Sequence, residues 1–269
     1  VIDIIFIGGG NGLSTVLKGF RDSSDNIVAV VTVFDSGGSS GLLRKTHRFY
    51  PPGDIRRCLV ALSRNGDLAR LFEHRFDKYL LGHSLGNLIL LALTEQEGGD
   101  FVRALERAHR LLRVNGRVLP VSLDHAELVA EFEDGSSVLG EDEITRRGEA
   151  VQRRIKRVWL VPEARVFEGA AEAIKNADVV VIGPGSLYTS IIPNFLVRGM
   201  VDVLRGSGAF MVYVSNITTQ RGETDNYRLS DHYKVLRSYL GFDVDLVLAN
   251  DNFVRNEAAE EMFSKGWLY

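Results

Sequence analysis

The chain has 269 residues, 45% of them hydrophobic and 25% charged, which is the ordinary mixture of a globular protein. Its formal net charge is −3, so no global positive field points to nucleic acid or to an anionic membrane. The single cysteine, Cys58, excludes an intramolecular disulfide and a zinc knuckle, and we expect it to be a small core residue. No apolar stretch approaches the roughly 20 residues that span a bilayer, and no signal peptide is visible, so we expect a cytoplasmic protein without a membrane span.

The chain opens with an apolar run, residues 2–7, that ends in the glycine-rich segment 8–12. This pattern predicts a buried strand, a tight loop and then a helix, whose free N–H groups favour an anion, most often a phosphate. The dinucleotide fingerprint would need a third glycine where Leu13 or Thr15 stands, and no Lys-Ser or Lys-Thr pair completes a Walker loop. The loop therefore predicts a small anionic ligand without naming a cofactor. A tight turn without a ligand is the alternative.

Further apolar runs rich in β-branched residues predict strands that are buried on both faces. They are residues 27–33, 179–182, 210–214 and 244–248. Amphipathic segments such as residues 231–240 lie between them, which is typical of a parallel sheet with helices on both faces. We therefore expect an α/β fold, a Rossmann-like, doubly wound and mostly parallel sheet, forming a single domain over residues 1–269.

Two stretches interrupt this alternation. Residues 54–112 have a mostly helical pattern, with breaks near Gly66, Gly82 and Gly98. From about 119 to 161 the pattern changes: residues 127–132 alternate and Asp134-Gly135 is a turn signal. We expect this second stretch to be a small β-containing insertion.

Polar and glycine-rich segments follow the predicted strands, at residues 8–12, 35–41, 183–190 and 215–220. Because the carboxyl ends of parallel strands meet at one edge of a sheet, we expect these segments to converge on a ligand. Asp35 ends the second strand, where a carboxylate can bind a ribose diol or a divalent ion, or simply form an Asx turn. The loop that follows is suited to wrap an anion with its N–H groups, its hydroxyls and the guanidinium of Arg44, unless it is only a flexible loop.

Residues 51–57 precede another apolar helix. Asp54 is placed to cap the amino end of this helix, or to contact a ligand. Arg56 and Arg57 lie in its first turn, where a cation opposes the helix dipole. We therefore expect one of the two arginines to contact a bound phosphate or carboxylate.

Residues 82–86 match the nucleophile elbow G-x-S-x-G of serine hydrolases. Only a weak apolar run, residues 79–81, precedes this motif, whereas an elbow follows a strong strand. We therefore favour Ser84 or His83 as the N-cap of a helix over residues 85–95, with Asn87 in its first turn and all three available to a ligand. A serine hydrolase using Ser84 stays open as the third function.

The loop after Ile182 offers a second glycine turn. Ser186, Tyr188 and Thr189 are placed there to reach a phosphate or a sugar hydroxyl. Tyr188 either stacks on a base or packs in the core.

Taken together, these motifs make the chain resemble the CofD/YvcK-like family. The matching segments are residues 8–14, 31–33, 35–41, 51–56, 82–88, 183–190 and 219–224. They occur in the family's order from Gly8 to Thr224, so the resemblance covers nearly the whole chain, and it is strongest to the YvcK branch.

This resemblance implies a Rossmann-like, cytoplasmic protein that binds UDP-N-acetylglucosamine, without a required cofactor, and couples carbon metabolism to cell-wall synthesis and cell shape. It leaves open a cell-wall or metabolic protein partner and a homo-oligomer. The residues we expect to contact the ligand are Gly9, Gly10, Asn11, Gly12, Asp35, Ser39, Ser40, Arg44, Asp54, Arg56, His83, Ser84, Asn87, Gly185, Ser186, Leu187, Tyr188, Thr189 and Asn216.

The CofD branch implies a second function, a nucleotide-dependent transferase that moves a phospholactyl group onto a deazaflavin coenzyme precursor with Mg²⁺. The family usually has two aspartates after the second strand and an arginine after Ser-Ser-Gly, where this chain has Ser36 and Leu42. Because one carboxylate is lost, we expect a binding and regulatory protein rather than an enzyme, with no metal ligands.

Overall fold

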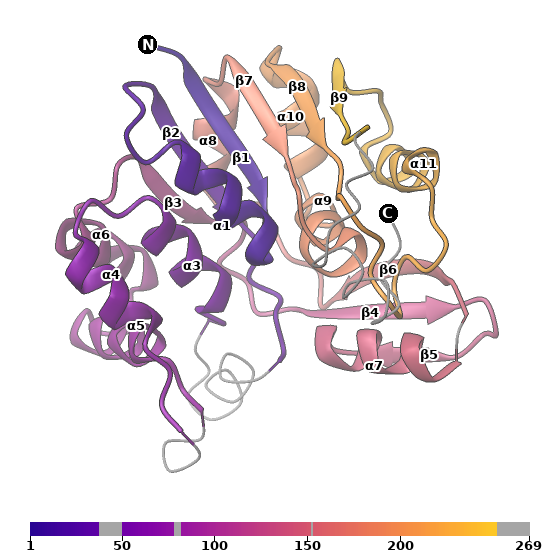
Figure 1. Ribbon diagram of the computed structural model, residues 1–269, viewed down its shortest axis with the longest axis horizontal. Helices are drawn as coiled ribbons and strands as arrows, with labels where there is room; N and C mark the ends of the chain where they lie inside the picture. Colours follow the sequence, from indigo (N-terminus) through magenta and orange to yellow (C-terminus); the bar gives the residue numbers. More distant parts are fainter. Residues whose placement is uncertain (38–49, 78–81, 152, 252–269) are drawn as a thin grey trace.

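The computed structural model describes residues 1–37, 50–77, 82–151 and 153–251 (Figure 1). Ser39, Ser40 and Arg44, three of the residues expected at the ligand, lie outside these ranges. Within the described ranges, no helix is both long enough and apolar enough to cross a bilayer.

The central sheet has six strands in the order β3-β2-β1-β7-β8-β9, and every neighbouring pair is parallel. The strands are β1 (Asp3–Gly8), β2 (Asn26–Val31), β3 (Arg117–Pro120), β7 (Val179–Ile182), β8 (Phe210–Val214) and β9 (Leu246–Leu248). This arrangement confirms the predicted Rossmann-like, doubly wound fold. Strand order reverses between β1 and β7, which is where open α/β sheets bind ligands.

The centre of the sheet is built by β1, which pairs on both sides. Ile5 lies opposite Val28 of β2 and Val180 of β7, and residues 5–7 are buried. A strand covered by helices on both faces needs apolar side chains at every position, which explains the unbroken apolar run in the sequence. Each such side chain removed from water contributes about 1.5–3 kcal/mol to folding.

Helices cover both faces of the sheet. They are α1 (Gly10–Gly19), α3 (Gly53–Ala61), α4 (Gly66–Glu73), α5 (Leu85–Gln96), α6 (Phe101–Leu112), α8 (Glu168–Lys175), α9 (Ile192–Phe195), α10 (Met200–Ser207) and α11 (Leu229–Leu240), with the π-helix η2 (Leu187–Ile191). In Figure 1, α1 and α3 lie in front of the sheet and α8 and α10 behind it. The stretch predicted to be helical, residues 54–112, contains α3 to α6.

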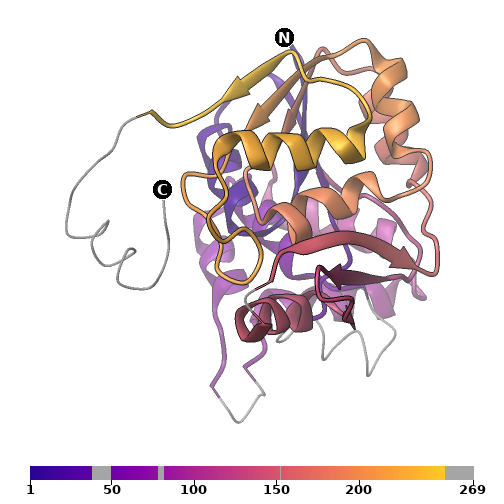
Figure 2. The ribbon, with the colours of Figure 1, turned by 90° about the vertical axis from the view of Figure 1, so that its right-hand side faces the viewer.

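A smaller antiparallel sheet lies beyond the carboxyl ends of the central strands (Figures 1 and 2). Its strands are β5 (Ser137–Leu139), β4 (Glu127–Phe132) and β6 (Ile155–Val161), in that order, and α7 (Glu141–Val151) packs against it. Here the expected start of the insertion, about residue 119, is too early. Leu119 and Pro120 belong to β3 and pair with β2 of the central sheet. The apolar pattern of this short edge strand is hard to recognise, because its first residue is an arginine and its last a proline.

Candidate functional site

A cavity of about 330 Å³ lies at the carboxyl ends of the central strands, at the low end of the size range of small-molecule sites. We call it the glycine-loop cavity. It is lined by Gly10, Asn11, Asp35, Gly37, Gly53, Asp54, Arg56, Arg57, Arg75, Asn87, Glu141, Ser186, Thr189 and Ser190. Three of the four segments predicted to converge, residues 8–12, 35–41 and 183–190, therefore contribute to this cavity, whereas its lining includes no residue of 215–220.

The glycines after β1 have different structural roles. Gly10 lines the cavity with φ +69°, a conformation that side chains disfavour. Gly9 and Gly12 instead permit close packing: a Cβ on Gly9 would lie 2.5 Å from Asp54 Oδ2, and one on Gly12 would lie 2.6 Å from the carbonyl oxygen of Pro184. The loop thus presents Gly10 and Asn11 to a ligand, while its other glycines fit α1 between neighbouring segments.

Four helices begin at this cavity, since α1, α3, α5 and α7 each contribute a residue of their first turn. The first turn of α1 has no acidic residue and no side-chain cap. Its unpaired backbone N–H groups and the positive end of the helix dipole are therefore suited to an anion.

Ser84 is the N-cap of α5, as predicted. Its Oγ accepts a hydrogen bond from the backbone N of Asn87 at 3.4 Å, and the residue is fully buried. This serine forms an isolated β-bridge with Arg75 and does not follow a strand of the central sheet. The environment of Ser84 is that of a helix-capping residue and does not indicate a catalytic nucleophile.

Arginines form one wall of the cavity. Arg56 is 5% exposed, and its Nε donates to Asn87 Oδ1 at 3.0 Å while Nη1 donates to the carbonyl oxygen of Phe72 at 3.2 Å. Burial, and then the nearby charges of Arg57 and Arg75, lower the pKa of Arg56 to about 10. It therefore stays charged at neutral pH, and an anion bound here would relieve the repulsion among the three guanidinium groups.

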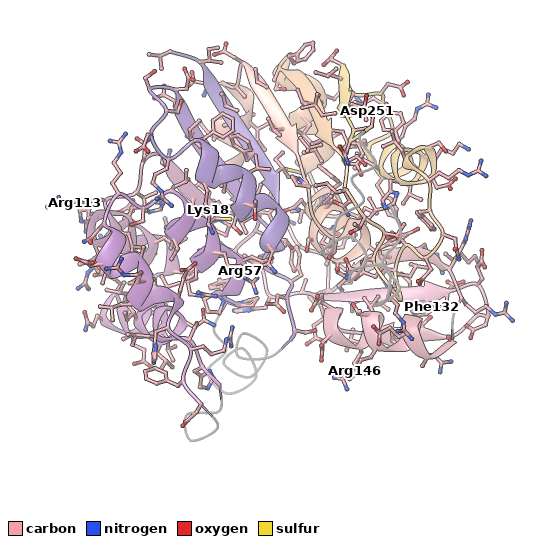
Figure 3. The ribbon with its side chains drawn as sticks, viewed as in Figure 1. Lys18, Arg57, Arg113, Phe132, Arg146 and Asp251 are labelled. Atoms are coloured by element: carbon pink, nitrogen blue, oxygen red, sulfur yellow. The ribbon has the colours of Figure 1, made fainter. Side chains whose placement is uncertain are left out.

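Asp54 does not cap α3, the first of the two roles predicted for it, but it lines the cavity, as the second role requires. The N-cap is Pro52, and Asp54 lies one residue inside the helix, where it pairs with Arg57. In Figure 3, the label of Arg57 lies beside α3, at the lower edge of the central sheet. Because the carboxylate is largely buried, it fixes the orientation of Arg57 at the cavity.

Carboxylates form a second wall. Asp35 Oδ1 accepts a hydrogen bond from the backbone N of Gly37 at 2.7 Å, the Asx turn considered above. Glu141 opens α7 and is close by: a Cβ on Gly37 would lie 3.4 Å from Glu141 Oε2 and 3.5 Å from Asp35 Oδ1. Burial, and then the charges of Asp35 and Glu223, raise the pKa of Glu141 to about 8.

The loop after β7 is held by Asn216. Its side-chain amide accepts from the backbone N of Gly185 at 3.0 Å and donates to the carbonyl oxygen of Gly185 at 2.8 Å. Ser186 and Thr189 line the cavity, and their hydroxyls donate to Gln220 and Glu223. Asn216 is thus a positioning residue, whereas Ser186 and Thr189 retain oxygen acceptors for a ligand.

Tyr188 and Leu187 lie in the core, away from the glycine-loop cavity. Tyr188 is 2% exposed, and its hydroxyl is 2.9 Å from that of Tyr227. Burial raises the pKa of this phenol. Stacking of Tyr188 on a ligand base does not fit this position, and the alternative packing role holds. His83 is also buried, and its carbonyl oxygen accepts from the backbone N of Phe76 at 2.9 Å.

Arg75 and Glu141 line the cavity although no motif in the sequence predicts them there. Glu141 is brought to Asp35 by the insertion, since Asp142 N donates to Ser36 Oγ at 3.3 Å across 106 positions of the chain. Gly86 of α5 permits the close approach of Arg56 to this helix, because a Cβ there would lie 2.7 Å from Arg56 Cδ.

The chain is similar to known proteins over most of its length. The family described as 2-phospho-L-lactate transferase CofD matches residues 4–266. A Thermotoga maritima protein is 49% identical over 268 residues, which are 98% of this chain and 83% of that protein. The gluconeogenesis factor of Halalkalibacterium halodurans is 46% identical over 90% of this chain and 75% of its own length. The gluconeogenesis factor of Bacillus subtilis is 45% identical over 94% of this chain and 80% of its own length. The crystal structure of a Bacillus halodurans protein superposes with a TM-score of 0.92 at 43% identity, covering 98% of this chain and 85% of that one.

Proposed function

Since the chain belongs to the CofD family and is similar over most of its length to gluconeogenesis factors, we propose that it binds UDP-N-acetylglucosamine in the glycine-loop cavity and acts as a regulator. The observation that carries this proposal is the pairing of the uncapped start of α1 with three arginines, Arg56, Arg57 and Arg75. Backbone N–H groups and guanidinium forks are the donors that a diphosphate requires.

The two walls of the cavity suit two adjoining parts of such a ligand, its diphosphate and its sugar. We assign the diphosphate to the arginine wall and the sugar hydroxyls to Asp35 and Glu141, whose oxygens accept hydrogen bonds from hydroxyl groups. With its pKa near 8, Glu141 carries a proton over much of the neutral range and also donates. A neutral acid beside a phosphate avoids the repulsion that a second carboxylate would add.

The regulatory part of the proposal rests on the relatives named gluconeogenesis factor and on the family resemblance of the motifs. In this proposed role, the protein is cytoplasmic and binds a cell-wall precursor. Through a protein partner, it adjusts carbon metabolism and cell shape to the level of that precursor. Binding without rapid turnover is what this role requires.

Isothermal titration with UDP-N-acetylglucosamine tests the binding site. Arg75→Gln should weaken binding about tenfold or more, because it removes one charged donor from the diphosphate. Arg113→Gln is the matched control: Arg113 lies at the far side of the helical layer in Figure 3, and its removal should leave the affinity unchanged. Equal affinity in wild type and Arg75→Gln would contradict the assignment.

A transferase remains the second candidate, because Glu141 supplies a carboxylate beside Asp35 where Ser36 replaces the usual second aspartate. Across the described residues, no three His, Cys, Asp or Glu side chains are placed to hold a metal ion. Asp35 and Glu141 together have the hard oxygen donors that Mg²⁺ takes alongside phosphate oxygens and water, and a cation there would also relieve the charge that raises the pKa of Glu141. Bound Mg²⁺ would neutralise charge on a transferring phosphoryl group.

Two readouts separate these candidates. The regulator is expected to bind equally well in magnesium and in chelator and to release no UDP or UMP over minutes. A strict magnesium requirement, or nucleotide release, would favour the transferase.

A further inference from the structure

A second cavity of about 300 Å³ lies where the loop before α11 packs onto α7. Figure 2 shows this golden loop descending toward α7. The packing is close: a Cβ on Gly148 would lie 1.7 Å from the carbonyl oxygen of Gly222. We call this space the arginine cavity. Its lining residues are Gly148, Glu149, Arg153, Arg154, Arg221, Glu223, Asp225 and Asn226.

Three of the residues that line this cavity are arginines. Arg154 lies over the ring of Tyr227, with its Cζ 5.1 Å from the ring centroid, which fixes the side chain by a cation–π contact. Within the described part of the chain, neither Arg153 nor Arg221 has a carboxylate within ion-pair distance, although Glu149 and Asp225 share the lining. Arginines without a carboxylate partner are suited to a phosphate, which their planar forks can bind through two hydrogen bonds.

Glu223 gives the second, independent sign of a ligand. It is 2% exposed, and its Oε1 accepts from Thr145, Thr189 and Gln220 at 3.0, 3.0 and 2.7 Å. Its Oε2 has no hydrogen-bond partner among the described residues, although the residue lines the cavity. A buried carboxyl oxygen without a partner costs about 1–3 kcal/mol, and a ligand hydroxyl would satisfy it once the carboxyl group turns toward the cavity.

We propose that the arginine cavity is a second ligand site, which takes a small phosphate ester that also carries hydroxyl groups, such as a sugar phosphate. Arg153, Arg154 and Arg221 bind the phosphate. Glu223, Glu149 and Asp225 accept hydrogen bonds from the hydroxyls. This site does not depend on the function proposed for the glycine-loop cavity.

Glu223 also connects the two cavities. Thr189 lines the glycine-loop cavity and donates to Glu223, and Ser186 of the same cavity donates to Gln220, which in turn donates to Glu223. A ligand that moves the carboxyl group of Glu223 would therefore alter the donors facing the first cavity, and occupancy of the two sites would be coupled in both directions. This coupling, unlike the site itself, rests on the proposed function.

Calorimetric titration with glucose 6-phosphate, inorganic phosphate and glucose tests the site. We expect glucose 6-phosphate to bind most tightly, and Arg153→Gln and Arg221→Gln each to weaken it about tenfold or more. Arg146→Gln is the control on α7, since Arg146 extends from the bottom of that helix in Figure 3 and its side chain is 63% exposed. Thermal unfolding confirms that each variant is folded.

The results that overturn the proposal are distinct. No binding of glucose 6-phosphate at millimolar concentration would overturn it, as would unchanged binding in folded Arg153→Gln and Arg221→Gln. Equal weakening by Arg75→Gln would place the phosphate in the glycine-loop cavity instead.

The coupling is tested by titrating UDP-N-acetylglucosamine with and without saturating glucose 6-phosphate. The affinity should change about threefold or more in wild type and in Thr145→Val, and by a smaller factor in Thr189→Val, which removes the direct link to the first cavity and leaves only the one through Gln220. Thr145 donates to the same oxygen of Glu223 and is the matched control. An unchanged affinity in wild type contradicts the coupling. Absence of any UDP-N-acetylglucosamine binding contradicts the proposed function and leaves the glucose 6-phosphate result standing.

Discussion

Arg56 donates from Nε to Asn87 Oδ1 over 3.0 Å, and this bond ties the fourth residue of α3 to the third residue of α5. Both residues are buried and both line the glycine-loop cavity. A buried guanidinium keeps its charge and direction only where its donors are occupied. Asn87 and the carbonyl oxygen of Phe72 provide this support, and so determine where the charge of Arg56 meets a ligand.

The first prediction concerns this bond. Asn87→Ala should weaken binding of UDP-N-acetylglucosamine about tenfold, because a hydrogen bond to a charged group is worth about 1.5–3 kcal/mol and its loss frees the guanidinium. Calorimetry measures the affinity. Asn176→Ala, at the exposed end of α8, is the control and should bind as wild type does. An undiminished affinity in folded Asn87→Ala would show that Arg56 needs no such support.

The second prediction concerns the glycine loop. Gly10→Val should abolish nucleotide-sugar binding, because a branched side chain disfavours φ +69° and would project at the start of α1. Gly19→Ala, at the other end of α1, meets nothing within 4 Å and should leave the affinity unchanged. Calorimetry on both folded variants decides. Wild-type affinity in Gly10→Val would remove the loop from the binding site.

The third prediction uses the pKa of Glu141, raised from 4.5 to about 8 by burial and by Asp35, Glu223, Asp54 and Asp142. Between these two values the folded protein binds more protons than the unfolded chain, so the free energy of unfolding should fall as pH rises and become level above pH 8. Glu141→Gln removes this dependence. The variant should gain stability relative to wild type as pH rises from 5 to 8, by roughly 3 kcal/mol.

Urea denaturation at several pH values measures that difference. Glu143→Gln is the matched control on the same helix, since Glu143 is exposed and pairs with Arg146, and its difference from wild type should show no such rise with pH. A constant difference between Glu141→Gln and wild type across the range would exclude a buried, proton-binding Glu141.

The fourth prediction concerns Ser84. As an N-cap, it should contribute about 1 kcal/mol to stability, so Ser84→Ala should lower the free energy of unfolding by that amount. A fluorophosphonate probe should not label the wild-type chain. Ser238→Ala, at an exposed position of α11, is the stability control. Stoichiometric labelling that disappears in Ser84→Ala would make the protein a serine hydrolase.

Local patterns in the sequence were enough to predict most of the central strands and the loops at their carboxyl ends. Unbroken apolar runs mark β1, β2, β7 and β8, and a parallel sheet places their carboxyl ends together. The edge strand β3 was missed because Arg117–Pro120 offers only a short apolar pattern. The side chain of Asp54 pairs with Arg57 and does not cap α3, and the spacing of residues in the sequence does not distinguish these two arrangements.

The candidate site was harder, because several of its residues meet only through tertiary packing. Glu141 comes to Asp35 because α7 docks on Ser36. Arg75 comes to the cavity of Arg56 because it forms a bridge with Ser84, the N-cap of α5. Tyr188 follows a glycine turn that suggests a ligand, yet the π-helix η2 rotates its side chain into the core beside Tyr227. Such distant contacts leave no periodic signal in the chain.

The central claim is that the glycine-loop cavity binds the diphosphate of UDP-N-acetylglucosamine. A crystal structure of the complex tests it most directly. We expect diphosphate oxygens within hydrogen-bond distance of the backbone N of Gly10 and of the guanidinium groups of Arg56 and Arg75. A nucleotide sugar bound elsewhere, with this cavity holding only water, would contradict the account.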